Sequence, residues 1–254
     1  MTLDTSKAVV ILGVLLALGM SSAAFIFGIQ AKQIGAGKQS IAVKGLAEKP
    51  VTADYAEWSV GLRVSGTTFA DALAKLRKER PALDAFLVAQ GFTADAVKSG
   101  KETVTPNIVE EEVPGGGGRT RSVQRGFNAA QDVLVTGKDL AAVEAAHKAM
   151  LQFEAEGHPV HYEDPAFLVS NLEDIKMSLI GAATQNAERR ALEFAKNGNA
   201  VVGAMRSASQ GAFYILPAGA SVDSSDYGYG GTYDKSTISK TARVVVTIEY
   251  NIER

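Results

Sequence analysis

Residues 55–64 read YAEWSVGLRV and residues 244–252 read VVVTIEYNI, and these two stretches decide the fold class. In each of them apolar and polar residues alternate, which in a strand puts every second side chain on the same face. The two apolar faces consist of Ala56, Trp58, Val60, Leu62 and Val64 in the first stretch, and of Val244, Val246, Ile248, Tyr250 and Ile252 in the second. Both stretches are therefore predicted to be strands that bury one face and expose the other.

A helix is predicted directly after the first of these strands. Thr67 and Thr68 precede residues with helical spacing, and Asp71 stands at the capping-box position. Pro81 predicts a kink or a restart of this helix, and Gly91 predicts its end.

Two further helices are expected, one after Gly137 and one over residues 172–196. A capping box of Ser170 and Glu173 opens the second one, and Asn197-Gly198 is a strong stop signal. Its apolar stripe is rich in alanine, which lets a helix lie close to a sheet. The stripe consists of Ile175, Leu179, Ala183, Ala187, Ala191, Phe194 and Ala195.

Residues 97–113 and 122–135 flank the sequence Pro-Gly-Gly-Gly-Gly at residues 114–118. This pattern predicts a β-hairpin with a glycine-rich tip, because glycine accepts any turn geometry. Acidic residues 110–112 precede the tip, and Arg119 and Arg121 follow it. Pairing of these charges across the two strands is expected to help set the register.

Shorter strands are predicted at residues 41–45, 160–169 and 200–209, and an irregular loop is predicted over residues 211–240. The expected order is β-β-α-β-β-α-β-α-β-β, and residues 55–169 have the β-α-β-β-α-β order of a ferredoxin-like arrangement. The fold class is therefore α+β, with a largely antiparallel sheet that carries helices on one face. One N-terminal transmembrane helix is expected to precede this sheet.

Several stretches together resemble the SIMPL-domain family of bacterial envelope proteins. They are KETVTPNIV at residues 101–109, AATQNAERRALEFAK at residues 182–196 and STISKTARVVVTIEYNI at residues 236–252, after the strand pair at 41–45 and 53–64. Ile108 departs from the pattern, since an aromatic residue is commoner there. The resemblance covers residues 40–254 and implies an envelope or periplasmic protein, self-assembly and a link to oxidative-stress tolerance. It implies no catalytic residues.

The N-terminal segment from residue 8 to residue 29 contains no charged residue. As a helix it would be about 33 Å long, enough to span the hydrocarbon core of a bilayer. The expected organisation is a tail at 1–7, an anchor at 8–29, a tether at 30–39 and a SIMPL-like domain at 40–254. The predicted anchor side chains are Val10, Leu12, Leu15, Leu16, Leu18, Phe25, Ile26 and Phe27.

A cleaved signal peptide remains the alternative for this segment. Lys7, the apolar run and the small residues Ser21-Ser22-Ala23-Ala24 fit a signal peptide with a cut after Ala24. The charges on either side of the segment do not fix its orientation. The family resemblance implies the location: the bacterial inner membrane with the soluble domain in the periplasm, or the periplasm itself after cleavage.

The composition of the chain argues against several classes of function. The chain has no cysteine, three histidines, and 26 Lys+Arg against 28 Asp+Glu, which gives a formal net charge of −2. No disulfide or cysteine–zinc site is possible, and a nucleic-acid partner is not expected because there is no basic excess. No cofactor, metal or catalytic residue is predicted. Three groups of residues lack the spacing of a working site. They are His158 with His161, Ser236 with Lys240, and Asp223, Asp226 and Asp234 as a calcium site.

The loop with three tyrosines, and the glycine tip of the hairpin, suit contacts between copies of the chain instead. Tyrosine is enriched at protein interfaces because it combines a large contact area with a polar tip. The predicted contact residues are Gly116, Gly117, Tyr227, Tyr229 and Tyr233. The sequence therefore predicts a membrane-tethered, self-assembling scaffold or binding module that is not an enzyme; the alternatives are a periplasmic enzyme and a monomeric adaptor.

Overall fold

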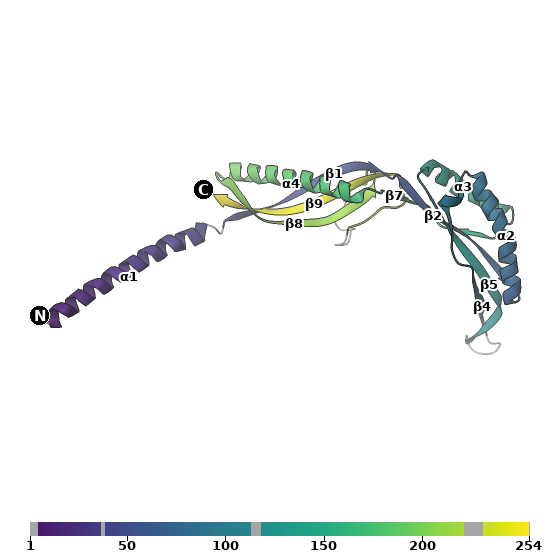
Figure 1. Cartoon of the computed structure of the whole chain (residues 1–254), viewed down its shortest axis with the longest axis horizontal. Coiled ribbons are helices and arrows are strands. Elements are labelled where there is room, and N and C mark those ends of the chain that lie inside the picture. The colour runs from purple at the N-terminus through teal and green to yellow at the C-terminus, as the bar shows by residue number, and fades with distance from the viewer. Residues whose placement is uncertain (1–4, 37–38, 113–117, 221–230, 254) are drawn as a thin grey trace. The chain divides into compact units, whose positions relative to one another are not determined.

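The computed structural model describes residues 5–36, 39–112, 118–220 and 231–253 (Figure 1). The chain divides into two compact units. Unit 1 consists of Met1–Ala47, Met177–Ala212 and Val244–Arg254, and unit 2 consists of Glu48–Lys176 and Phe213–Arg243. The domain predicted over residues 40–254 contributes to both.

Unit 2 is built on an antiparallel sheet whose central pair is β2 (Tyr55–Gly66) and β5 (Thr120–Gly137). The other edge of β5 pairs with β3 (Val97–Ser99) and β4 (Thr103–Glu112). The other edge of β2 pairs with β6 (Val160–Tyr162) and β7 (Ala166–Leu168). This order matches the predicted ferredoxin-like arrangement, except that each outer strand is split in two.

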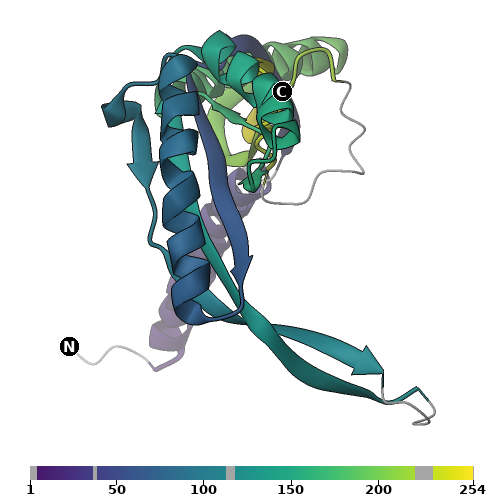
Figure 2. The ribbon, with the colours of Figure 1, turned by 90° about the vertical axis from the view of Figure 1, so that its right-hand side faces the viewer.

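Helices α2 (Phe69–Ala89) and α3 (Leu140–Ala155) pack against β2, and Figure 2 shows α2 lying along the sheet. The five predicted core residues of β2 are all buried, as are residues on the facing side of each helix. The helices supply Ala72, Leu76, Leu83, Leu87, Val143, Ala146 and Met150 to one continuous apolar core. The α+β class and the alternation of β2 are therefore confirmed.

The start of α2 shows why the chain turns into a helix at this point. The Thr68 hydroxyl accepts a hydrogen bond from the Asp71 backbone N–H at 3.1 Å, and the Asp71 carboxylate accepts one from the Thr67 N–H at 2.9 Å. These bonds satisfy N–H groups that have no partner within the helix. The helix continues through Pro81 to Ala89, so the predicted restart is wrong.

The predicted hairpin is formed by β4 and β5, and Figure 2 shows it extending beyond the rest of the sheet. On the N-terminal side of Phe127, the described residues of β5 pair with β4 but not with β2. The name "arm" is used for residues 108–112 and 118–126. Glu111 of the arm pairs with Arg121 at 3.5 Å and also with Arg125, which confirms the predicted cross-strand charge pairing.

A three-stranded sheet in the order β1-β9-β8 contains β1 (Ser40–Thr52), β9 (Ser239–Glu253) and β8 (Val201–Pro217). The predicted alternation of β9 is confirmed, since Val244, Val246, Ile248 and Tyr250 are buried. Helix α4 (Leu172–Asn197) runs alongside these strands in unit 1 (Figure 1).

The alanine stripe of α4 allows the close approach that the sequence predicts. Ala183, Ala187 and Ala191 are fully buried, and a side chain at Gly45 of β1 would overlap the Ala183 carbonyl. Phe194 is an error in the predicted stripe, because it is 62% exposed. The predicted capping box is also not formed as expected: the N–H and hydroxyl of Ser170 donate to the carboxylate of Asp54.

Several predicted strands have different bounds. β1 runs through Pro50 to Thr52 because it is an edge strand, where a missing N–H is tolerated. The strand expected at residues 160–169 is divided into β6 and β7, with Pro165 between them. β8 continues to Pro217, so the first part of the predicted loop is a strand, and the predicted single sheet is two sheets.

Helix α1 (Thr5–Ala36) covers the predicted anchor. Its side chains are described at Val10 and residues 12–28, and the eight predicted anchor side chains are between 59% and 77% exposed. Among the described residues, no helix has both the length and the apolar character needed to cross a membrane. The transmembrane part of the predicted fold class is therefore not confirmed.

Candidate functional site

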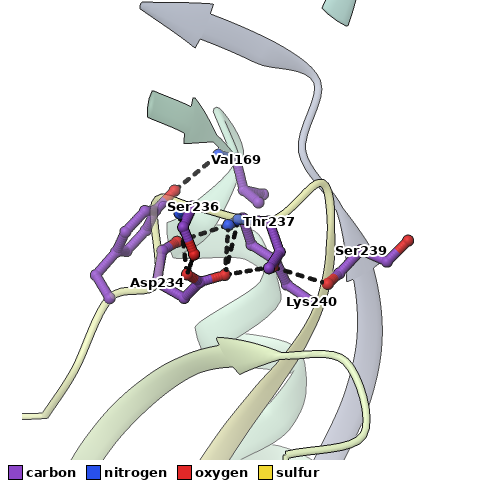
Figure 3. Close-up of polar contacts among 7 residues, drawn as sticks. Val169, Asp234, Ser236, Thr237, Ser239 and Lys240 are labelled. Atoms are coloured by element: carbon purple, nitrogen blue, oxygen red, sulfur yellow. Dashed lines mark hydrogen bonds and ion pairs between the residues drawn. The ribbon is translucent and has the colours of Figure 1, made fainter. Parts of the chain in front are cut away.

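The best organised polar cluster of unit 2 surrounds Asp234 and Lys240 (Figure 3). The side chain of Lys240 is fully buried, and its ammonium donates to the Asp234 carbonyl at 2.6 Å and to the Asp234 carboxylate at 2.9 Å. The same carboxylate accepts hydrogen bonds from the Ser236 N–H and hydroxyl and from the Thr237 N–H and hydroxyl. A buried charge is tolerated only when it is paired and hydrogen-bonded in this way.

The charge state of Asp234 follows from these contacts. Burial alone would disfavour the carboxylate, but hydrogen bonds from Thr237, Lys240 and Ser236 outweigh it and hold the pKa of Asp234 well below its usual range. Both oxygens accept bonds from the chain itself. The cluster is thus a structural clamp that fixes the start of β9, and its carboxylate is not available as a general acid or base near neutral pH.

We expect Asp234→Asn to flatten the acid limb of the stability curve. Because the pKa of Asp234 is lower in the folded than in the unfolded chain, its contribution is complete above its ordinary value of 3.8 and is lost as the pH falls below it. Unfolding followed from pH 5 to pH 2 through the fluorescence of Trp58 measures this slope, and Trp58 is the chain's only tryptophan. Asp95→Asn, at an exposed position, should keep the wild-type slope; equal slopes for the two variants would contradict the assignment.

Of the five predicted contact residues, Tyr233 is the one that the structure describes. Its hydroxyl accepts a hydrogen bond from the Val169 N–H at 2.7 Å, and Tyr233 directly precedes Asp234 in the chain. Gly116, Gly117, Tyr227 and Tyr229 lie outside the described residues. Asp223 and Asp226, two of the three carboxylates considered for calcium, lie outside them as well.

A small cavity of about 190 Å³ in unit 2 brings together the residue types of a hydrolase triad. His147 Nε2 lies 3.4 Å from the Asp164 carboxylate, and Ser236 lines the same cavity. The Ser236 hydroxyl, however, donates to Asp234 at 2.7 Å. A serine nucleophile needs its proton directed at the base, so this arrangement is not a working triad.

The remaining histidines are held by structural contacts. His158 lies 3.2 Å from a Glu79 carboxylate oxygen and stacks on Phe153 at 4.1 Å between ring centroids. His161 is on β6, opposite Gly61 of β2. Within the described residues, no three His, Asp or Glu side chains are grouped so that they could hold a metal ion.

A groove of about 820 Å³ in unit 1 lies between β1 and the second half of α4. Three cations line it, Lys44, Arg189 and Arg190, against one carboxylate, Glu193. Arg190 donates to the Lys44 carbonyl at 2.9 Å, and Asn186 accepts from the Leu46 N–H at 3.2 Å. These side chains cover polar groups of the β1 edge that would otherwise be open to another strand. The sequence reasoning missed this groove.

The fold and these sites define an α+β protein with a polar clamp and a cationic groove. The chain belongs to the SIMPL family, described as proteins of unknown function (DUF541), whose model matches residues 41–250. The predicted resemblance to this family is therefore confirmed. A comparison with curated proteins gives no match.

Proposed function

We propose that this chain is a membrane-tethered envelope protein that assembles with copies of itself into a ring or cage and acts as a scaffold or binding module. In this proposal the protein has no enzymatic role, and its partners are other copies of the chain and a lipid bilayer. The link to stress tolerance rests on the family resemblance alone.

The arm is the observation that supports self-assembly. A two-stranded ribbon is marginally stable by itself in water, and stable sheets need a third strand or a packed helix. The described residues 120–126 of β5 pair only with β4. Ile108 on this ribbon is 62% exposed, whereas isoleucine is among the residue types most often buried. A surface on another copy of the chain would supply the missing packing.

We expect Ile108→Asp to reduce the mass of the assembly. The full chain in mild detergent, measured by light scattering after size exclusion, should give one large discrete mass, and the variant should give a smaller one. Leu151→Asp is the matched control, because Leu151 is a similarly exposed apolar residue on α3, away from the arm. A monomeric wild-type chain would refute the assembly, and an unchanged mass for Ile108→Asp would refute the role of the arm.

Helix α1 supports the tether. Residues 8–29 carry no charge, and the described side chains of this stretch are exposed. An apolar helix that its own chain leaves uncovered is stabilised by another apolar phase. We place the helix in the bacterial inner membrane and the rest of the chain in the periplasm, on the strength of the family resemblance. Export to the periplasm after cleavage behind Ala24 is the competing outcome.

A further inference from the structure

The groove of unit 1 combines positive charge with exposed apolar side chains. Lys44, Arg189 and Arg190 line it together with Leu192 and Phe194, and these two are 51% and 62% exposed. Guanidinium groups bind phosphate oxygens with paired hydrogen bonds, and apolar side chains beside them can enter the boundary between headgroups and acyl chains. The groove therefore has the chemistry of a site for an anionic phospholipid surface.

The chain connects this groove closely to the predicted tether. Helix α1 ends at Ala36 and β1 begins at Ser40, and Ala42 of β1 already lines the groove. Five residues lie between Ala36 and Ala42, and even a fully extended chain covers these six steps in about 20 Å. The groove therefore begins within about 20 Å of the end of α1.

The sequence around the end of α1 is basic, like the lining of the groove. Residues 30–39 read QAKQIGAGKQ, with Lys32 and Lys38 and no acidic residue. Basic residues next to a membrane span are attracted to anionic headgroups, and the attraction decays within a Debye length of the surface. Continuity of positive charge from the tether to the groove favours a lipid surface over a protein partner.

We propose that the groove between β1 and α4 binds the anionic headgroups of the bilayer that holds α1. The guanidinium of Arg189 contacts lipid phosphate, and Phe194 and Leu192 rest at the headgroup boundary. Arg190 keeps its bond to the Lys44 carbonyl, so the site is formed before lipid arrives. This inference rests on the proposed tether and adds the orientation of unit 1, which would lie against the membrane.

The test uses the full chain, which has no cysteine of its own, so that a single introduced cysteine carries one label. Phe194→Cys is labelled with an environment-sensitive fluorophore and reconstituted into vesicles of phosphatidylcholine alone or of an equimolar mixture with phosphatidylglycerol. Lipids carrying a quencher near the headgroup report contact. Leu151→Cys, at an exposed position in unit 2, is the control.

We expect quenching at position 194 in the vesicles with phosphatidylglycerol, little in phosphatidylcholine, and release at high salt. Arg189→Gln should lower the ratio of docked to undocked label about fivefold, the effect of one basic residue near an anionic surface. Quenching at 151 should stay at background in both vesicles.

Flotation of the vesicles distinguishes the proposed tether from the proposed binding of anionic headgroups by the groove. A full chain that floats with neither vesicle would overturn the tether, and the inference with it. A chain that floats with both vesicles but shows no quenching at position 194 would overturn the inference and leave the tether standing. Equal quenching in both vesicles would overturn the requirement for anionic headgroups.

Discussion

Lys240→Met is expected to destabilise the protein by about 3–5 kcal/mol, the usual cost of removing one partner from a buried ion pair. The Lys240 side chain is fully buried, and methionine fills much of the same space without a charge. The loss therefore comes from the Asp234 carboxylate, which stays buried without its ammonium. Denaturant unfolding followed through Trp58 measures the change, because Trp58 is buried in the core of unit 2.

The double variant Asp234→Asn with Lys240→Met distinguishes a charge effect from a packing effect. Without a carboxylate there is no unpaired charge, so the double variant should be more stable than Lys240→Met alone. A single variant within about 1 kcal/mol of the wild type, which is the range of an exposed ion pair, would show that the pair does not hold β9.

Gly45→Ala is expected to cost about 1–3 kcal/mol, the range for inserting atoms into a packed region. A Cβ at this position would overlap the Ala183 carbonyl and lie 2.8 Å from the Ala187 backbone nitrogen. Both contacts are with the backbone of α4, which cannot move aside as a flexible side chain can. Hydrogen exchange of the β1 amides should therefore accelerate.

Gly181→Ala is the matched control in the same unit. Gly181 lies within α4, and a Cβ there meets nothing within 4 Å. Alanine is favoured over glycine in a helix by about 1 kcal/mol, so this variant should slow exchange in α4. If both glycine variants behaved alike, close packing of β1 against α4 would be refuted.

The buried face of β9 could have been predicted to begin before Val244, at Lys240. Lys240 has the same parity as Ala242 and Val244, so the alternation already places it on the buried face. A lysine on such a face signals a buried partner. That partner, Asp234, lies in an irregular segment, where no periodicity indicates which carboxylate turns inward.

The groove of unit 1 could not have been predicted from local pattern. It depends on α4 reaching a strand far away in the sequence, as the bond from Arg190 to the Lys44 carbonyl shows. The extension of β8 is a different kind of error. Residues 212–216 read AFYIL, an apolar and strand-forming run, but the glycine, serine and aspartate around it favoured a loop.

Gly126 is the hinge of the arm. It has a φ of +85°, and it lies where the register between β4 and β5 shifts, so that the ribbon bends there. About 20 Å of strand separate Gly126 from Thr120, the first residue of β5, at about 3.4 Å per residue. A backbone rotation of about 10° at Gly126 would move Thr120 by about 3.5 Å, which is more than the length of a hydrogen bond. In an assembly held together by the arm, the distance between subunits would therefore depend on the backbone dihedral angles of Gly126.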